Sequence, residues 1–371
     1  MKILQVLPAL SAGGVERTAI EIAGALRDGG HVPHVACAGG RLEPELSAAG
    51  GILHRLPLET KNPIKMRRNT KALIKIIKDN TIDIVHARSR APAWSAYAAA
   101  KACGVPYLAT YHGIYNAKSG LKRRYNAIMA RGEIVIANSQ FTADHIVREH
   151  GLPPDTIRVI PRGVDMARFD PARVTNAAKA ELLKSWNIEG ERTVILLPGR
   201  LTSWKGQQVA IDSLPMKTRL NPVLVLLGDA QGRDDYVQSL WARAQALGYK
   251  DALRIPGHSA DMPAAYAAAD FVLSCSTDPE AFGRVAAEAQ AMGRWVIASD
   301  HGGAKETVID GVTGARVPPG DASALRAALE AGPSAAFTPE CSRAHIAQNF
   351  SDTQMKAKTL AVYAELLAAP L

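Results

Sequence analysis

Short aliphatic segments alternate with longer segments of helical periodicity along almost the whole chain, and this series occurs twice. Gly, Pro, Asn or Asp residues bound the aliphatic segments, as expected of buried strands. The first series of expected strands comprises residues 3–8, 34–38, 82–87, 107–111 and 134–137, and the second comprises 194–198, 223–228, 253–256, 271–275, 295–298 and 315–317. Such alternation builds a parallel sheet with helices on both faces. The chain is therefore predicted to be an α/β protein with two doubly wound parallel-sheet domains.

The expected helices lie between these strands and define the domain boundaries. They comprise residues 16–26, 43–49, 65–78, 93–102, 206–213, 234–247, 261–268, 284–292 and 322–331, with a last amphipathic helix at about 352–368. A further strand at 157–161 leads into residues 166–180, which we expect to be a linker. The expected domains are 1–165, 166–350 and a C-terminal helix over 351–371 that packs back on the first domain. Since ligands of such sheets bind at the carboxyl ends of the strands, the site is expected in a cleft between the two domains.

The composition is that of an ordinary globular protein. Hydrophobic residues make up 47% of the 371 residues and charged residues 21%, which excludes the disordered and fibrous classes. No run of 18 apolar residues occurs, which excludes a conventional transmembrane helix. The four cysteines are far apart and form no CxxC motif, as expected of a reduced, cytoplasmic protein.

Positive charge is concentrated in the first half of the chain. Residues 1–165 carry 23 Lys and Arg against 13 Asp and Glu, a net charge of +10, whereas residues 166–371 carry 21 against 22, a net charge of −1. The first half is therefore expected to face something anionic, such as a phospholipid surface, a phosphorylated glycolipid or nucleic acid. Aromatic residues, which would stack on bases, are sparse in its basic segments, and this argues against nucleic acid.

Basic residues cluster at three places in this half. Residues 61–78 contain seven Lys and Arg beside an apolar side, and a second segment contains Lys118, Lys122, Arg123 and Arg124. Basic amphipathic helices suit anionic lipid headgroups, and the alternative is a core-packed helix with a solvated basic face. Arg88 and Arg90 follow the strand at 82–87, where they are placed either for an anionic acceptor or for structural ion pairs.

Glycines and cations follow two of the expected strands. Gly13 and Gly14 lie between a strand and a helix, where they allow a ligand to approach free N–H groups, although a plain tight turn is an equal explanation. The spacing is not GxGxxG, so a nicotinamide fingerprint is absent. Arg200 and Lys205 follow the strand at 194–198 and are placed to clamp a diphosphate, the alternative being two solvated surface cations.

Two carboxylates follow another expected strand of the second series. A loop carries Glu280, and Phe282 and Gly283 begin a helix that holds Glu288. The first N–H groups of a helix lack internal partners, so they suit a phosphate or sugar hydroxyls. The carboxylates suit hydroxyl recognition, but an i,i+4 ion pair with Arg284 is the alternative explanation of Glu288.

Taken together, these motifs resemble the family 4 retaining glycosyltransferases of GT-B fold over essentially the whole chain. The matching motifs are Gly13-Gly14-Val15-Glu16, Asp83-Ile84-Val85-His86, Thr110-Tyr111-His112-Gly113, Ala137-Asn138-Ser139, Gly163-Val164-Asp165, Gly199-Arg200-Leu201 with Lys205-Gly206, Glu280-x7-Glu288, Gly302-Gly303, Glu306 and Asp310-Gly311-x-x-Gly314. Each motif is loose, but their order and spacing are specific. The resemblance implies two Rossmann-like domains that face one another across a cleft.

The resemblance also implies a role for each matching residue. Arg200 and Lys205 would bind the diphosphate of a nucleotide-sugar donor, and Glu288 would bind its ribose hydroxyls. Glu280 would bind the transferred sugar, together with the amides of Phe282 and Gly283. His112 would lie beside the sugar, and Gly13-Gly14 would close over the phosphates. Such enzymes usually need no metal or other cofactor, and nothing in the chain resembles a DxD metal site. Departure of the nucleoside diphosphate builds negative charge, which prepositioned cations stabilise.

The chain departs from the family pattern at three positions. Arg162 stands where Asn is common, Ala281 where Gly is usual, and Arg284 where an aliphatic residue is common. We hypothesise that Arg284 contacts an acidic or phosphorylated group of a ligand, the alternative being its ion pair with Glu288.

The function expected from these features is transfer of a hexose from a UDP- or GDP-linked sugar to a glycolipid or glycan acceptor. Residues 86–92, together with His112-Gly113-Ile114-Tyr115-Asn116, look like those of the lipopolysaccharide-core members of the family. This likeness suggests cell-envelope biosynthesis at the cytoplasmic face of the membrane. One alternative is a GT-B nucleotide-sugar epimerase or phosphorylase-like relative, and another is a non-catalytic protein that binds anionic lipid or nucleic acid. The sequence names neither the base, the sugar, the acceptor nor the oligomeric state.

Overall fold

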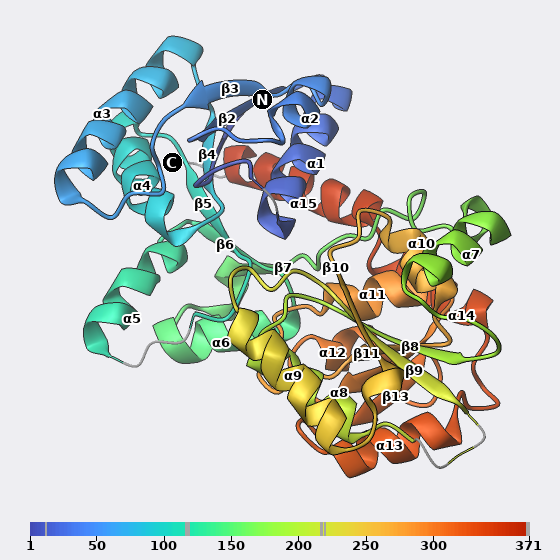
Figure 1. Cartoon of the computed structure of the whole chain (residues 1–371). Helices are drawn as coiled ribbons and strands as arrows, with labels where there is room; N and C mark the ends of the chain where they lie inside the picture. The colour runs from blue at the N-terminus through green and yellow to red at the C-terminus, as the bar shows by residue number, and fades with distance from the viewer. Residues whose placement is uncertain (12, 116–118, 216–217, 219, 369–371) are drawn as a thin grey trace. The chain divides into compact units, whose positions relative to one another are not determined.

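The computed structural model of the chain describes residues 1–11, 13–115, 119–215, 218 and 220–368. The chain divides into two compact units: Met1–Pro161 with Asp352–Leu371, called unit 1 here, and Arg162–Ser351, called unit 2. Each unit contains a parallel sheet flanked by helices (Figure 1). The predicted α/β class with two parallel-sheet domains is therefore confirmed. Within the described ranges, no helix combines the length and apolar character needed to cross a membrane.

In its described part, unit 1 holds a seven-stranded parallel sheet in the order β3-β2-β1-β4-β5-β6-β7. The strands are β1 (Lys2–Val6), β2 (Val32–Cys37), β3 (Ile52–Arg55), β4 (Ile84–Ala87), β5 (Tyr107–Tyr111), β6 (Ile134–Ala137) and β7 (Ile157–Val159). The helices are α1 (Gly14–Asp28), α2 (Glu43–Ala48), α3 (Pro63–Asn80), α4 (Arg90–Cys103), α5 (Gly120–Asn126), α6 (Gln140–His150) and α15 (Asp352–Ala368). The strand order reverses between β1 and β4.

The two faces of this sheet pack against different helices, because side chains alternate along a strand. Ile3 lies in a buried cluster with residues of α1 and α15, whereas Leu4 packs with Leu73 of α3. The C-terminal helix is thus part of the core of unit 1. It also contributes a buried hydrogen bond, since the hydroxyl of Tyr363 lies 2.7 Å from Nδ1 of His86.

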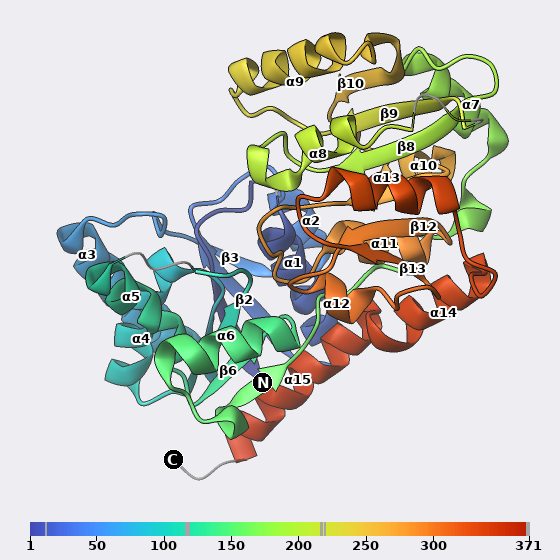
Figure 2. The same ribbon diagram turned by 90° about the horizontal axis from the view of Figure 1, so that it is seen from below.

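In its described part, unit 2 holds a six-stranded parallel sheet in the order β10-β9-β8-β11-β12-β13. The strands are β8 (Thr193–Pro198), β9 (Pro222–Leu227), β10 (Leu253–Gly257), β11 (Phe271–Ser274), β12 (Trp295–Ser299) and β13 (Gly314–Val317). The helices are α7 (Asn176–Ser185), α8 (Gln207–Asp212), α9 (Asp234–Ala246), α10 (Met262–Ala268), α11 (Arg284–Ala291), α12 (Ala304–Thr307), α13 (Ala322–Ala331) and α14 (Pro339–Asn349). Helices α8, α9 and α13 cover one face, and α7, α10, α11 and α14 cover the other (Figure 2). The order reverses between β8 and β11, and ligands of doubly wound sheets bind at that point.

Every strand predicted from the sequence is present, with ends displaced by no more than two residues. The structure adds the edge strand β3 and the helices α5, α6, α7, α12 and α14. The prediction of a linker over 166–180 is wrong from Asn176 onward, where α7 begins. Thr175 starts this helix, because its side chain accepts a hydrogen bond from the amide of Ala178 at 3.1 Å.

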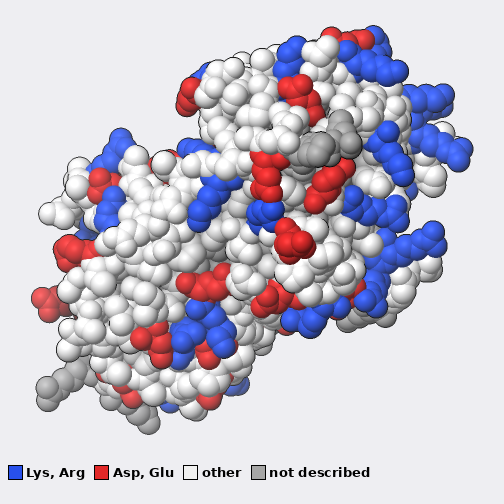
Figure 3. Space-filling view, turned by 180° about the vertical axis from the view of Figure 1, so that it is seen from behind, with Lys and Arg blue, Asp and Glu red and all other residues white. Residues whose placement is uncertain are grey.

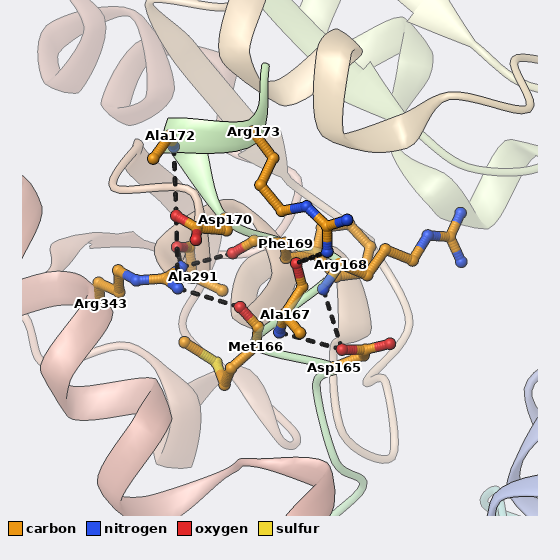
Figure 4. Close-up of polar contacts among 10 residues, drawn as sticks. All are labelled: Asp165, Met166, Ala167, Arg168, Phe169, Asp170, Ala172, Arg173, Ala291 and Arg343. Carbon is orange, nitrogen blue, oxygen red and sulfur yellow. Dashed lines mark hydrogen bonds and ion pairs between the residues drawn. The ribbon is translucent and has the colours of Figure 1, made fainter.

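Arg343 of α14 fastens the first residues of unit 2 to the body of that unit (Figure 4). Its guanidinium donates to the carbonyl oxygens of Met166, at 3.0 Å, and of Phe169. It also donates to the carbonyl of Ala291, the last residue of α11, at 2.7 Å. One cation therefore joins three separate segments of unit 2.

Replacing Arg343 by alanine is expected to lower the free energy of unfolding by about 3 kcal/mol, because three carbonyl oxygens lose a charged donor. Arg173→Ala is the matched control, since Arg173 donates a single bond, to Ala167 at 3.0 Å. That control should lose less than about 1 kcal/mol. Urea denaturation followed by tryptophan fluorescence measures both changes, because four of the five tryptophans lie in unit 2. Equal losses in the two variants would contradict the fastening role of Arg343.

Candidate functional site

Three loops of unit 2 meet at the carboxyl edge of its sheet. They follow β8, β11 and β12, which are neighbours in the order of the strands. The first loop carries Arg200 and Lys205, and the second carries Glu280, Phe282 and Gly283. The structure therefore brings these predicted residues to one edge of one unit, at the point where the strand order reverses.

Lys205 and Glu280 form an ion pair across this edge. Nζ of Lys205 lies 2.8 Å from Oε1 of Glu280, and the two side chains are 13% and 18% exposed. The hydroxyl of Ser276 donates to the same carboxylate oxygen at 2.6 Å. The ammonium also lies 4.6 Å from the centre of the Trp204 ring, within the range of a cation–π contact. The contacts fix both charges in place.

The environment of Glu280 keeps its carboxyl ionised. Burial alone would raise the pKa of Glu280, but the charge of Lys205 and the hydrogen bonds from Lys205 and Ser276 outweigh it. His301 acts in the same direction, and the net result is a pKa below the ordinary value of 4.5. A carboxylate at neutral pH accepts hydrogen bonds, as binding of sugar hydroxyls requires.

Arg200 is exposed, in contrast to Lys205. Its guanidinium has no hydrogen-bond or ion-pair partner among the residues that the structure describes. Its carbonyl oxygen accepts a hydrogen bond from Nε2 of the buried Gln207, at 3.0 Å. The backbone is thus held while the cation remains open to an anionic ligand.

The N-terminus of α11 has no side-chain cap. Gly283 precedes the helix with φ 82°. A glycine pair after β12 packs directly on this loop: a Cβ on Gly302 would lie 2.4 Å from the carbonyl oxygen of Glu280, and the amide of Gly303 donates to that oxygen at 2.8 Å. Phe282 is buried. Glycine is required at Gly302 because the two loops approach so closely.

Glu288 lies on α11 with its carboxylate largely buried. The hydroxyl of Tyr266 donates to Oε2 at 2.9 Å, and Nε of Arg284 donates to Oε1 at 3.1 Å. Arg284 thus forms the i,i+4 ion pair that the sequence left open as an alternative. Sequence reasoning missed Ser276 and Tyr266; Ser276 follows a predicted strand directly, but no local pattern links Tyr266 to Glu288.

The predicted residues of unit 1 lie at the carboxyl edge of its own sheet. Gly13 precedes α1 with φ 147°, and its added Cβ would lie 2.7 Å from Oε2 of Glu16. Gly14 is the first residue of α1. His112 follows β5 directly. The pKa of the nearby His86 is lowered mainly by burial, and the charge of His112 contributes to the lowering.

Arg88 and Arg90 both contact other side chains of unit 1. Arg88 is 2% exposed and donates from Nε to Oε1 of Gln5 at 2.6 Å. Arg90 donates to Oδ1 of Asn126 at 2.8 Å and stacks over the ring of Tyr115 at 4.2 Å. Both arginines thus have partners in unit 1, but among the described residues these are hydrogen bonds and a ring contact, not the ion pairs that the sequence suggested.

The basic segments of unit 1 are exposed. Lys122, Arg123 and Arg124 lie on α5, and Arg123 donates to the carbonyl of Glu149 at 2.9 Å. Lys118 lies outside the described residues. The apolar side of α3 is packed in the core while its cations are exposed, and Figure 3 shows Lys and Arg side chains gathered along the edge of unit 1 that carries α3 and α5.

Two family models match the chain. The model described as Glycosyltransferase Family 4 matches residues 12–168, and the model described as Glycosyl transferases group 1 matches residues 178–331. A glycosyltransferase from Rickettsia africae of known crystal structure is 36% identical, with a TM-score of 0.92 over 100% of this chain and 99% of that chain. HepE of Anabaena in complex with UDP-glucose is 26% identical, with a TM-score of 0.84 over 98% and 100%.

Curated relatives agree with this assignment over a shorter span. The D-inositol 3-phosphate glycosyltransferase of Xylanimonas cellulosilytica is 31% identical over 253 residues, which are 63% of this chain and 60% of that protein. The chain thus spans less than two thirds of that relative. The family resemblance seen in the motifs is confirmed by the family models and by the full-length structural relative. The chain belongs to glycosyltransferase family 4, with its GT-B fold of two parallel-sheet units.

Proposed function

We propose that the chain is a retaining hexosyltransferase that uses a nucleoside-diphosphate sugar, with UDP or GDP as the leaving group. The observation that carries this proposal is the joint placement of Arg200, Lys205 and Glu280 at the carboxyl edge of β8 and β11. An open guanidinium and a fixed ammonium suit a diphosphate, and the adjacent carboxylate suits the hydroxyls of a sugar.

Each residue has a distinct part in the proposed reaction. Arg200 and Lys205 bind the diphosphate and stabilise the negative charge that grows as the sugar–phosphate bond breaks. Glu280 binds the hexose, together with the amides at Phe282 and Gly283. The acceptor hydroxyl attacks on the face from which the diphosphate leaves and passes its proton to a phosphate oxygen, so the anomeric configuration is retained. We expect this reaction to need no metal ion, so that EDTA leaves the rate unchanged.

The other residues predicted to bind the donor complete the proposal. Glu288 binds the ribose hydroxyls, His112 contacts the sugar, and Gly13 and Gly14 approach the phosphates. The UDP-glucose complex of HepE supports a uridine donor for this chain.

A nucleotide panel tests the donor site. UDP, GDP, ADP and CMP are each added to the wild type and to Glu288→Ala, and the melting temperature is measured against the same protein without ligand. UDP or GDP at 100 times its Kd adds about 2.7 kcal/mol, which raises the melting temperature by several degrees. Glu288→Ala should lose most of this shift, whereas the exposed Glu330→Ala should keep it. No shift with any nucleotide in the wild type would overturn the proposed donor.

The proposed acceptor is an anionic glycolipid or glycan of the cell envelope, reached at the cytoplasmic face of the membrane. The exposed cations of α3 and α5 support this proposal, as do two exposed apolar side chains on the same helices, Ile64 (65% exposed) and Leu121 (83% exposed). Apolar side chains beside cations suit a lipid headgroup region. A phosphorylated inositol is a second candidate acceptor, supported by the curated relatives and by the positive charge of residues 1–165.

Vesicle co-sedimentation tests the membrane proposal. The protein should bind vesicles that contain phosphatidylserine at low salt and should not bind neutral vesicles. Reversing three exposed charges of α3, with Arg67→Glu, Arg68→Glu and Lys71→Glu, should weaken binding by more than about 100-fold, at about 1 kcal/mol per cation. The matched control reverses three exposed lysines of unit 2, with Lys184→Glu, Lys250→Glu and Lys305→Glu. Equal losses of vesicle binding in the two triple variants would contradict the specific role of α3.

A further inference from the structure

The carboxylate of Glu288 is held from two sides by side chains of unit 2. Tyr266 of α10 donates to Oε2 at 2.9 Å, and Arg284 of α11 contacts Oε1 through Nε at 3.1 Å and Nη2 at 2.9 Å. Glu288 as a whole residue is only 9% exposed. A carboxylate buried to this degree is costly unless donors satisfy it, so both contacts are integral to the local structure.

Tyr266 is a rigid donor for this carboxylate. It is fully buried, and its ring packs against Phe169 with centroids 6.0 Å apart. Burial and the adjacent negative charge of Glu288 raise the pKa of Tyr266 well above its ordinary value of 10, so the hydroxyl stays protonated at any working pH. Among the described residues, its hydroxyl donates to Oε2 of Glu288.

Helix energetics do not account for Arg284. It is the first residue of α11, where the helix dipole disfavours a cation. A basic residue four positions before an acidic one is also the less favourable order for an i,i+4 pair. The contacts of its Nε and Nη2 with Oε1 of Glu288 are therefore not explained by the stability of the helix.

The two contacts leave part of the carboxylate open. A carboxylate offers about four acceptor positions, and the hydroxyl of Tyr266 uses one of the two on Oε2. With Oε1 held by Arg284, the plane of the carboxylate is fixed and the second position on Oε2 faces in a defined direction. A ligand hydroxyl at that position meets a preoriented acceptor.

We propose that Tyr266 and Arg284 are positioning residues of the donor site, which hold the Glu288 carboxylate in the orientation that accepts a hydrogen bond from the donor ribose. The inference rests on the proposed role of Glu288. It assigns to Arg284 a function through Glu288 in place of a direct contact with a phosphorylated ligand.

Calorimetric titration with UDP and with its 2′-deoxy and 3′-deoxy forms tests this inference, with the GDP series used if GDP is the nucleotide that binds. In the wild type, at least one deoxy form should bind about 10-fold more weakly than the parent nucleotide, as expected for a lost hydrogen bond to a charged group. In Tyr266→Phe and Arg284→Leu, the parent nucleotide should bind about 5- to 10-fold more weakly while the deoxy form changes less than about 2-fold. The discrimination between the two nucleotides then disappears.

The controls separate positioning from general damage. Tyr249→Phe removes another hydroxyl of unit 2, and Arg243→Leu removes an arginine that pairs with Asp212; both should keep the discrimination. If Tyr266→Phe does not fold, Arg284→Leu carries the test, because that side chain is 31% exposed. Equal weakening of parent and deoxy nucleotides would indicate a merely structural role and overturn the inference.

Glu288→Ala distinguishes the failure of this inference from that of the proposed function. If Glu288→Ala abolishes the discrimination while Tyr266→Phe and Arg284→Leu retain it, only the positioning role is overturned. If the wild type does not discriminate, or binds neither UDP nor GDP, the ribose contact fails and the inference fails with it.

Discussion

Replacing Lys205 by alanine is expected to lower kcat/KM for glycosyl transfer by about 10²- to 10³-fold, the usual effect of removing one preorganised group that stabilises transition-state charge. The ammonium is held 2.8 Å from the carboxylate of Glu280 and 4.6 Å from the ring of Trp204. A cation fixed by such contacts needs little reorganisation when the diphosphate departs. It is therefore expected to lower the activation barrier by a large amount. Initial rates at low donor concentration measure the change.

Two further variants serve as comparisons for Lys205→Ala. Lys250→Ala removes an exposed lysine just before β10, at the amino edge of the same sheet, and should change kcat/KM by less than about 2-fold. Lys205→Arg keeps the charge and should recover part of the activity. A loss of less than about 10-fold in Lys205→Ala would contradict the assignment of Lys205 to the leaving diphosphate.

Lys205→Ala should also change the pH dependence of the enzyme. In the wild type the pKa of Glu280 is below 4.5, so its ionised form contributes stability above the unfolded-state pKa, and this contribution is lost only as the pH falls through the lowered value. Without Lys205, only the hydrogen bond from Ser276 and the charge of His301 oppose the effect of burial, and the pKa of Glu280 rises. Lys205→Ala should therefore lose its residual activity at a higher pH than the wild type does.

Gly206→Ala is expected to be among the most damaging single substitutions in unit 2. Gly206 ends the Lys205 loop with φ 77°, and a Cβ added there would lie 2.0 Å from the carbonyl oxygen of Cys275. The left-handed backbone costs about 1 kcal/mol for alanine, and relieving the overlap adds about 1–3 kcal/mol. Because the loops after β8 and β11 must then separate, Lys205 moves relative to Glu280, and a shift of about 1 Å lowers activity by about 100-fold.

Gly232→Ala is the matched control for this substitution. Gly232 has the same φ of 77°, but nothing lies within 4 Å of a Cβ added to it. It should lose only about 1 kcal/mol of stability and no activity. Urea denaturation and initial rates measure the two changes in both variants. Equal effects would show that backbone strain, rather than the contact between the two loops, makes glycine necessary at Gly206.

The buried strands were predictable because their patterns are local. In parallel sheets covered on both faces, strands form continuous aliphatic segments, and each such segment is a strand in the structure. The edge strand β3 was not predicted because two of its four residues, His54 and Arg55, are polar. The strand is partly exposed, so it does not need a continuous apolar segment. Helices α6 and α14 had a usable signal, since Ser139 and Thr338 cap them with their side chains.

The placement of the proposed donor-site residues was predictable for a related reason. Arg200 and Glu280 lie in loops that follow strands, and the carboxyl ends of parallel strands meet at one edge whatever the details of packing. The motif spacing therefore determined which loops meet at this edge. It did not determine whether Arg284 faces a ligand or Glu288, because both are compatible with the first turn of a helix.

The sequence by itself determined the fold class, the order of most strands and helices along the chain, and the loops that carry Arg200, Lys205 and Glu280. Only the tertiary structure decided that Arg88 lies buried against Gln5 and that Tyr266 donates to Glu288. Those partners are 83 and 22 residues apart in the chain. Periodicity records which face of an element is apolar, but the partner of a buried polar group depends on how separate elements pack, and no local pattern contains that information.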